Sequence, residues 1–286
     1  MILHRECNIW TLGGDQRQLQ LARLLAADGH TVHIYALDTP ESEDSLHQIK
    51  RADCIIFPLP VSDDSNNLNA PLSRGTCALS AILSQLSPSQ FLCGGRVTPA
   101  VQELCETFHL HMHDYFAQEE LIVSNAIPTA EGAIQIAMEQ LPITIHGSRV
   151  LVLGFGRVGR ITAQRFAALG AKVSVAARNY AQLALARSMD LGTEHLSHLT
   201  GWMCSYDLII NTIPAPVLNR EQLEDVKADC LILDLASQPG GVDRSAAHAL
   251  GISVIHALGL PGKVAPVTAG AAIQRTIYHM LTDAGF

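Results

Sequence analysis

A glycine-rich turn between an apolar run and a helical pattern constrains this chain more than any other feature. Residues 149–153 form an apolar run of strand length, and the G-x-G-x-x-G sequence of residues 154–159 follows it directly. Residues 161–169 have a helical pattern that ends at Gly170, and residues 172–178 have the character of a second strand. This order predicts a βαβ unit that opens with a dinucleotide-binding fingerprint.

Each glycine of the fingerprint has an expected task. Gly154 permits the tight turn, Gly156 lets the backbone approach a pyrophosphate, and Gly159 lets helix and strand pack closely. The helix N-terminus adds N–H groups and partial positive charge for the phosphates. The alternative is a glycine turn that serves packing alone, but the two flanking strands favour a Rossmann nucleotide site. Its expected residues are Gly154, Phe155, Gly156, Arg157, Val158 and Gly159.

The end of the second strand indicates which nucleotide binds. NAD sites usually place a carboxylate about 20 residues after the first glycine, where it holds the ribose 2′-hydroxyl. This chain has Arg178 and Asn179 at that place, and no Asp or Glu occurs between Gly154 and Asp190. An arginine fork suits a 2′-phosphate, and Arg157 adds positive charge nearby. The alternative is an ordinary surface arginine, but the pattern favours NADP over NAD.

Two later segments are expected to border the nicotinamide. Residues 211–214 and 234–237 each follow an apolar strand pattern. Ligands of parallel sheets lie beyond the carboxyl ends of the strands. Thr212, Pro214 and Ser237 are therefore predicted to contact the cofactor.

Composition provides for a substantial core and argues against a nucleic-acid partner or a membrane span. Its 286 residues are 48% hydrophobic and 16% charged, with a formal charge of −8, which argues against a nucleic-acid partner. The seven cysteines form no C-x-x-C motif, and we expect reduced, mostly buried thiols of a cytoplasmic protein. Arg5 and Glu6 interrupt the first residues, so no signal peptide is expected, and no apolar stretch reaches membrane-spanning length.

Strand and helix patterns also alternate through the first part of the chain. Residues 8–12, 31–35 and 53–58 are expected strands, and residues 16–27 an expected helix. The alternation predicts an α/β protein with two doubly wound parallel-sheet domains, the second a Rossmann NADP-binding domain. We expect a substrate domain of residues 1–126 with 267–286, a dinucleotide-binding domain of residues 143–264, and a linking helix at 127–142. Thr268 is the expected cap of the last helix.

Asp15 and Arg17 are the first candidates for substrate contact. A cation in the first turn of a helix is disfavoured by the helix dipole, and a bound carboxylate would reverse that penalty. Arg17 would then grip the carboxylate with its planar fork. The alternative is that Arg17 pairs with Asp15 or another acid and is simply solvated.

Thr129 and Glu131 are the second candidates, because they follow Pro128 at the expected start of the linking helix. An acid in a first helical turn is favourable for dipole reasons alone, which is the alternative to a catalytic role. Asp15 and Glu131 both remain possible proton acceptors. His109, His111 and His113 alternate as on one strand face, which we interpret as a solvated face rather than a metal site, and His195 and His198 offer still less.

Several motifs together resemble those of the dipicolinate synthase family, specifically its A subunit. They run from the N-terminal strand to the C-terminal helix and are far more specific than the glycine fingerprint. They are Gly13-Gly14-Asp15-x-Arg17-Gln18, Ile127-Pro128-Thr129-x-Glu131-Gly132, Asn211-Thr212-Ile213-Pro214, Leu233-Asp234-Leu235-Ala236-Ser237 and Gly259-Leu260-Pro261-Gly262.

The resemblance implies a reaction, a cofactor and a partner. The expected reaction oxidises a dihydrodipicolinate-type ring, formed from 4-hydroxy-tetrahydrodipicolinate on a branch of the lysine pathway, to dipicolinate with NADP. The product accumulates in endospores during sporulation, and the partner is a flavoprotein-like B subunit. Two alternatives stay open: another NADP oxidoreductase of shikimate- or hydroxy-acid-dehydrogenase type, and a non-catalytic NADP-binding regulatory subunit.

Overall fold

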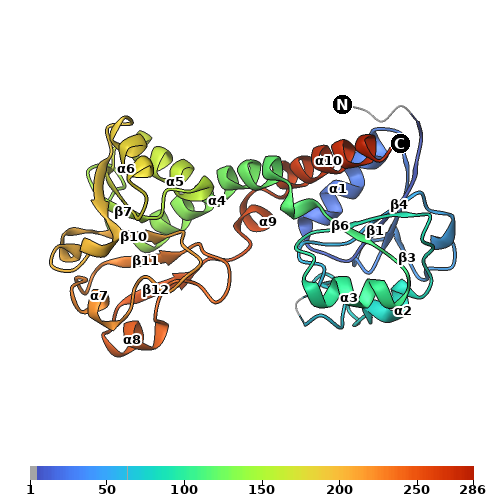
Figure 1. Cartoon of the computed structure of the whole chain (residues 1–286), viewed down its shortest axis with the longest axis horizontal. Helices are drawn as coiled ribbons and strands as arrows, with labels where there is room; N and C mark the ends of the chain where they lie inside the picture. Colours follow the sequence, from blue (N-terminus) through green and yellow to red (C-terminus); the bar gives the residue numbers. More distant parts are fainter. Residues whose placement is uncertain (1–4, 63) are drawn as a thin grey trace. The chain divides into compact units, whose positions relative to one another are not determined.

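The computed structural model describes residues 5–62 and 64–286 and contains two compact units (Figure 1). The first unit comprises Met1–Asn125 with Ala265–Phe286, and the second comprises Ala126–Val264. Each unit has a six-stranded sheet whose named strands pair in parallel. The predicted α/β fold of two parallel-sheet domains is therefore confirmed. Residues 1–4, part of the segment in which no signal peptide is expected, lie outside the described residues.

The sheet of the first unit has the order β3-β2-β1-β4-β5-β6. The direction of winding reverses between β1 and β4, which is where doubly wound sheets bind their ligands. The expected strands at residues 8–12 and 31–35 are confirmed. The strands are β1 (Asn8–Leu12), β2 (Thr31–Tyr35), β3 (Ser42–Glu43), β4 (Cys54–Ile56), β5 (Phe91–Gly94) and β6 (Met112–Asp114).

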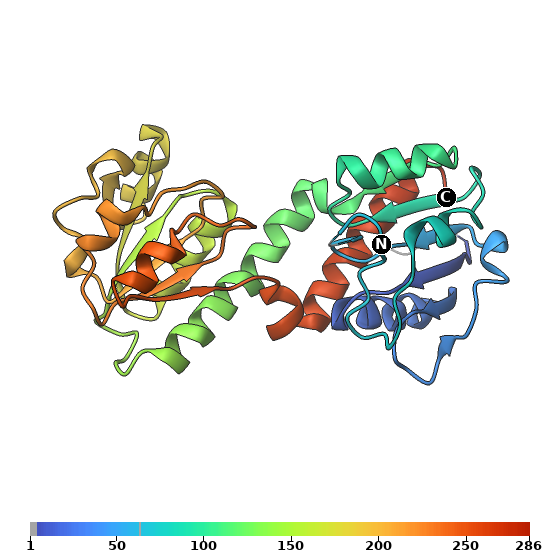
Figure 2. The same cartoon turned by 90° about the horizontal axis from the view of Figure 1, so that it is seen from below.

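Helices cover both faces of the first sheet. On one face α1 (Gln16–Ala27) and α10 (Pro266–Asp283) lie side by side, as Figures 1 and 2 show. On the other face α2 (Leu79–Leu83) and α3 (Pro99–Thr107) pack over a second apolar cluster. Burial on both faces explains why the central strands β4 and β5 are apolar throughout instead of alternating.

The sheet of the second unit has the order β12-β11-β10-β7-β8-β9, with its reversal between β7 and β10. Helices α4, α5 and α6 cover one face, and α7 and α8 cover the other. The strands are β7 (Arg149–Leu153), β8 (Lys172–Ala177), β9 (Gly192–His195), β10 (Leu208–Asn211), β11 (Leu231–Asp234) and β12 (Ser253–His256). The helices are α4 (Glu119–Gln140), α5 (Arg157–Ala168), α6 (Tyr180–Arg187), α7 (Arg220–Glu224), α8 (Arg244–Ala249) and α9 (Leu260–Val264).

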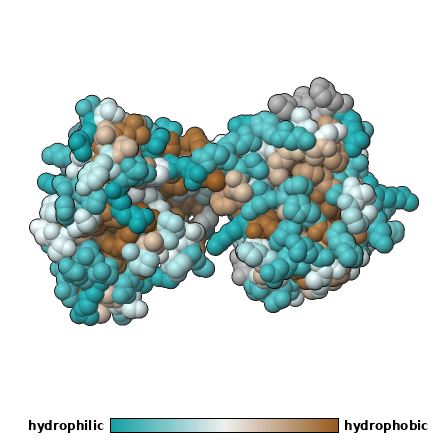
Figure 3. Space-filling model, viewed as in Figure 1, coloured by the Kyte–Doolittle hydropathy of each residue, from teal (hydrophilic) through white to brown (hydrophobic). Residues whose placement is uncertain are grey.

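The surface and the cysteines can be compared with what the composition predicts. Hydrophilic residues predominate on the face of each unit that Figure 3 shows. All seven cysteines are free thiols and most are buried, as expected, while Cys77 is half-buried and Cys204 exposed. Burial raises the pKa of the Cys230 thiol to about 12. Within the described ranges, no helix is both long and apolar enough to cross a membrane.

Two predicted helix starts were wrong. The linking helix was expected to begin at residue 127, but α4 begins at Glu119 and continues through Pro128. Neighbouring small side chains, Ala126 and Ala130, are fully buried, so tertiary packing outweighs the lost proline N–H. The last helix has Ala265 as its N-cap with Pro266 in the first turn, so Thr268 is not the cap.

The expected solvated face of three histidines is confirmed, because His109, His111 and His113 are exposed and alternate with the buried Leu110 and Met112, but the strand is shorter than expected. The strand β6 begins only at Met112, and His109 lies before it with a positive φ of 58°. His113 stacks on Phe91 with ring centroids 4.7 Å apart, and burial followed by the nearby His111 lowers the pKa of His113. His111 instead accepts a hydrogen bond from Gln102 at 2.9 Å. The rings of His111 and His113 also contact each other, with centroids 4.8 Å apart, so these two histidines lie together on the exposed face.

A buried hydrogen-bond chain fastens α10 onto the end of α1. The Tyr278 hydroxyl donates to Asp28 Oδ2 at 2.8 Å, and the His30 Nε2 lies 3.1 Å from that hydroxyl. His30 Nδ1 accepts from the backbone N–H of Cys7 at 3.3 Å, so Nε2 is the donor to Tyr278. Burial, and then Asp28, raises the pKa of Tyr278, which keeps its hydroxyl protonated.

Replacing Tyr278 with phenylalanine should destabilise the first unit by about 1–3 kcal/mol, because the buried His30 N–H then lacks its acceptor. Urea unfolding followed by Trp10 fluorescence in a Trp202→Phe background measures this effect. Tyr180→Phe is the matched control, since Tyr180 lies in the second unit and is 71% exposed. An unchanged Trp10 transition in Tyr278→Phe would show that the chain of hydrogen bonds adds nothing.

Candidate functional site

The glycine turn between β7 and α5 has the geometry of a phosphate-binding loop. Gly154 has a φ of 91°, and a Cβ there would lie 2.6 Å from the hydroxyl oxygen of Thr212. A Cβ on Gly159 would overlap the carbonyl oxygen of Gly154. A Cβ on Gly156, in contrast, would meet nothing within 4 Å. Two glycines therefore permit packing, while Gly156 leaves open space over the turn.

The helix α5 presents its N-terminus at this open space. Gly156 is its N-cap and makes no side-chain cap hydrogen bond. Phe155 is buried beneath the turn, with the Arg160 guanidinium 5.8 Å from the centre of its ring. Arg157 is exposed and Val158 half-buried in the first turn of the helix. The uncapped N–H groups and the helix dipole suit a pyrophosphate, so the residues fit the dinucleotide that the sequence predicts.

Loops after β10 and β11 border the same edge of the sheet. The Thr212 hydroxyl donates to the Leu153 carbonyl at 2.8 Å and so links the loop after β10 to β7 at the winding reversal. Pro214 and Ser237 are exposed in their loops. The strand order places these loops next to the glycine turn. The structure thus brings Thr212 to the edge where a nucleotide is expected.

A buried polar pair shapes these loops. Asn211 donates to Asp234 Oδ1 at 2.8 Å, and its side chain also bridges to both the N–H and the carbonyl of Ile213. Asp234 accepts further hydrogen bonds from the N–H groups of Ala236 and Gly241, at 3.1 and 2.8 Å. Since the contacts occupy both carboxylate oxygens, we interpret Asp234 as a loop-shaping residue.

The carboxyl end of β8 presents an unpaired cation. Arg178 is exposed, and its guanidinium has no hydrogen-bond or ion-pair partner among residues 5–62 and 64–286. Asn179 is the N-cap of α6, where its Oδ1 accepts from the N–H of Ala181 at 2.8 Å. The available donor at this end is therefore the arginine fork, whereas the asparagine side chain is already engaged.

In the first unit the turn after β1 encloses a buried arginine. Gly13 and Gly14 have φ values of 52° and 90°. Arg17 is 9% exposed and donates to Asp15 through Nε at 2.9 Å and Nη2 at 2.8 Å. Nη2 also donates to the carbonyl of Leu59 at 2.8 Å. The pairing with Asp15 follows one of the two readings of the sequence, but the arginine is buried instead of solvated.

Gln18 is a structural residue of this turn that sequence reasoning did not single out. Its buried side chain donates to the Leu12 carbonyl at 3.5 Å and to the Ile56 carbonyl at 3.0 Å. These carbonyls end β1 and β4, the two strands on either side of the winding reversal. The available signal in the sequence was the helical spacing that Gln18 shares with the apolar residues Leu21 and Leu25.

Thr129 and Glu131 lie in the middle of α4, so the expectation that they occupy the first turn of a helix was wrong. Thr129 is half-buried and Glu131 exposed. The helix dipole gives no reason for an acid at this position, because its effect is confined to the helix ends. The dipole alternative for Glu131 is thereby removed.

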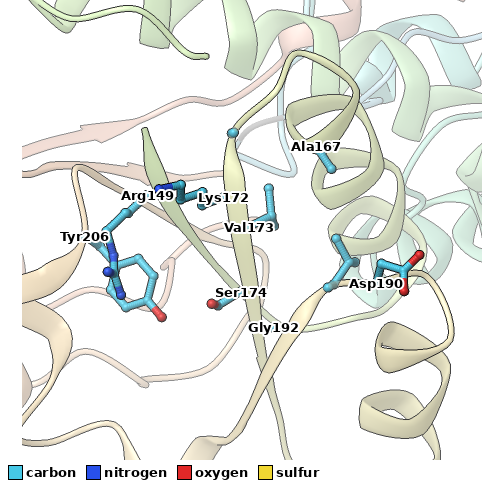
Figure 4. A pocket seen from close by; sticks show the side chains of 10 residues that line it. Arg149, Ala167, Lys172, Val173, Ser174, Asp190, Gly192 and Tyr206 are labelled. Atoms are coloured by element: carbon cyan, nitrogen blue, oxygen red, sulfur yellow. The ribbon is translucent and has the colours of Figure 1, made fainter. Parts of the chain in front are cut away.

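A pocket of about 410 Å³ lies at the opposite edge of the second sheet, as Figure 4 shows. Arg149, Lys172, Ser174 and Tyr206 are among the residues that line it. Arg149 and Lys172 begin β7 and β8, whereas the glycine turn follows the end of β7. This pocket is therefore separate from the fingerprint.

Two parallel-sheet units, with an open glycine cradle in the second, define the chain as a two-domain oxidoreductase of the Rossmann type. Residues 135–257 match the family model described as shikimate/quinate 5-dehydrogenase. Residues 8–116 match the model for the N-terminal domain of the dipicolinate synthase A subunit.

Whole-chain comparisons identify the family. The chain is 33% identical over 284 residues to the A subunit of dipicolinate synthase from Bacillus subtilis strain 168, covering 96% of each protein. It is similar to the crystal structure of the A chain of dipicolinate synthase from Bacillus subtilis, with a TM-score of 0.87 and 32% identity. The match covers 99% of this protein and 97% of that structure. The corresponding structure from Bacillus halodurans gives a TM-score of 0.86, 30% identity and 97% coverage of both chains. The chain belongs to the family of dipicolinate synthase A subunits.

Gly156→Ala and Gly159→Ala should separate binding from folding. The alanine methyl at residue 156 meets no protein atom, so this variant should melt like the wild type yet bind NADPH at least about tenfold more weakly. Gly159→Ala must displace the Gly154 carbonyl and should lower the melting temperature. Thermal unfolding and nucleotide titration measure both effects. Full NADPH affinity in Gly156→Ala would place the pyrophosphate elsewhere.

Proposed function

We propose that the chain is the catalytic A subunit of a dipicolinate synthase. It oxidises a dihydrodipicolinate-type compound, derived from 4-hydroxy-tetrahydrodipicolinate, to dipicolinate with NADP. The observation that supports this most is the 33% identity, over 96% of both chains, to the Bacillus subtilis relative. The direct test is the ultraviolet absorbance of dipicolinate formed from freshly generated substrate and NADP.

The cofactor is proposed to bind the second unit through Gly154, Phe155, Gly156, Arg157, Val158 and Gly159, with Thr212, Pro214 and Ser237 beside the nicotinamide. The open space over Gly156 supports this placement. When bound, NADP supplies the hydride acceptor. Arg178 and Asn179 are proposed to hold the adenosine end, and the unpaired guanidinium of Arg178 supports NADP over NAD.

Arg178→Asp should weaken NADPH binding by about ten- to a hundredfold, because it removes a charge-assisted fork and adds a repelling carboxylate. NADH, which lacks the 2′-phosphate, should lose much less. Fluorescence titration of the purified chain with both nucleotides measures the ratio. Arg187→Asp is the matched control, since Arg187 is an exposed arginine on the neighbouring helix α6 that is hydrogen-bonded to Thr193. Equal losses for NADPH and NADH would contradict the NADP assignment.

The substrate is proposed to bind at the carboxyl edge of the first sheet, where Asp15 and Arg17 lie. Hydrogen bonds to described residues engage Nε and Nη2 of Arg17, which leaves Nη1 for a substrate carboxylate. The first turn of α1 supplies N–H groups for the same charge. Thr129 and Glu131 are proposed as further site residues, on the strength of their motif in α4.

In the proposed reaction the protein needs to orient the substrate and the cofactor and to accept one proton. Loss of a hydride and a ring proton converts the dihydropyridine ring into an aromatic pyridine, and the stability of that product lowers the need for a strong base. Asp15 and Glu131 are the two proposed proton acceptors. Asp15 is oriented by Arg17, whereas Glu131 is an exposed carboxylate on α4.

Arg17→Ala should lower kcat/KM for the dicarboxylate by about ten- to a hundredfold while NADPH binding to the second unit stays unchanged. Arg17→Lys should recover little, because an ammonium offers a point charge in place of a planar fork. The rate of dipicolinate formation, followed by its absorbance with saturating NADP and with the partner protein present, measures the effect. Near-wild-type turnover in Arg17→Ala would show that the Asp15–Arg17 pair only shapes the turn. Circular dichroism checks that the first unit remains folded.

We further infer that the chain works in the cytoplasm with a flavoprotein-like B subunit, during sporulation. The names of its relatives describe one polypeptide of a larger enzyme, which supports a partner. A second candidate function, a shikimate-type dehydrogenase, is favoured by the family match of residues 135–257 alone. Turnover of dipicolinate precursor but not shikimate separates the two, and turnover by the isolated chain would exclude a purely regulatory role.

A further inference from the structure

The carboxyl ends of β8 and β9 place a histidine beside Arg178. The register pairs Ala177 with His195, so the residue after β8 lies next to the last residue of β9. His195 Nε2 lies 3.1 Å from the Arg178 carbonyl oxygen, which can only accept, so Nε2 is the protonated nitrogen. The opposite nitrogen, Nδ1, accepts from the hydroxyl and the N–H of Ser197, at 2.7 and 3.3 Å. This network fixes both the ring and the Arg178 backbone.

Two further rings surround His195. The Tyr180 ring stacks on it at a centroid distance of 5.2 Å and an angle of 24°, and Tyr180 is 71% exposed. The His198 ring lies 5.7 Å from the His195 ring. His198 is exposed, and its ring nitrogens make no hydrogen bond to the described part of the chain. The indole Nε1 of Trp202 donates to the His198 carbonyl and holds this short segment in place.

Arg178 and His198 are the two residues at this strand edge that can serve an anion, because both ring nitrogens of His195 are already hydrogen-bonded. The Arg178 guanidinium and the His198 imidazole make no hydrogen bond or ion pair to residues 5–62 and 64–286, and His195 contacts the Arg178 backbone carbonyl and the His198 ring. Glu194 precedes His195, but alternation along the strand directs it to the other face of the sheet. A phosphate can accept from an arginine fork and an imidazole N–H together.

We propose that His198 is a second ligand of the nucleotide's 2′-phosphate, next to Arg178, and that His195 is the positioning residue that aligns both. The inference rests on the proposed preference for NADP and adds to it two residues that a fingerprint search does not find. The ring of Tyr180 fixes the imidazole of His195 from its open side.

Titrations of the full chain with NADPH and NADH test the proposal. His198→Ala should weaken NADPH about tenfold and leave NADH within about twofold, because only NADPH has the 2′-phosphate. Adenosine 2′-monophosphate should compete with NADPH better than adenosine 5′-monophosphate does, and His198→Ala should remove that advantage. His248→Ala, an exposed histidine on α8, is the matched control and should change neither affinity.

The positioning role needs a different pair of variants. His195→Ala should lower the NADPH affinity as much as His198→Ala does, whereas His195→Gln should restore most of it. The glutamine amide reaches the place of Nε2 and keeps the donor to the Arg178 carbonyl. If the glutamine variant were no better than alanine, the positioning role would be wrong.

The outcomes separate this inference from the proposed function. Equal losses of NADPH and NADH in His198→Ala overturn the phosphate contact. A wild type that prefers NADPH, loses that preference in Arg178→Asp and keeps it in His198→Ala overturns the inference alone. A wild type without any preference for NADPH overturns the NADP assignment, and the inference with it.

Discussion

The close packing of α5 against the glycine turn after β7 is the constraint on which the candidate site of the second unit depends. Gly159 lies against the carbonyl of Gly154, and any side chain at residue 159 would separate α5 from β7. That contact sets the position of the helix N-terminus over the turn, and the open space at Gly156 follows from it. Close packing at Gly154 and Gly159 and the proposed phosphate binding over Gly156 therefore depend on the same turn.

Both units use a polar side chain to hold together the two strands at the winding reversal of the sheet. In both sheets a polar side chain joins the two strands at the winding reversal: Gln18 bonds the carbonyls of Leu12 and Ile56, and Thr212 bonds the carbonyl of Leu153. Gln18 supplies a side-chain donor to two strand-end carbonyls, and the Leu153 carbonyl accepts from both the hydroxyl and the backbone N–H of Thr212, at 2.8 and 2.9 Å. Side-chain hydrogen bonds therefore hold the carboxyl edge at each winding reversal without any ligand.

Sequence patterns predicted the fold well and the site in part, for physical reasons. Strand runs and the glycine spacing are local, so β1, β7 and the fingerprint turn were found directly. Pro128 misplaced the start of α4, because buried neighbours hold a proline inside a helix that propensity alone would end. His195 was dismissed because its partner, Arg178, is near only through the β8–β9 register. Such long-range pairings leave no periodic signal.

Two arginines at corresponding sheet edges differ in what a ligand must displace. Arg17 is buried and already bonded twice to Asp15, so an incoming carboxylate must share or replace an existing ion pair. Arg178 is exposed and bonded to no described side chain, so an incoming phosphate displaces only water. A desolvated arginine that is already paired selects for ligands whose carboxylate offsets the cost of disturbing the ion pair, and a ligand without such a group is disfavoured. An exposed fork adds affinity with less selectivity. On these grounds we propose that the first unit determines substrate specificity and that the second unit binds the cofactor.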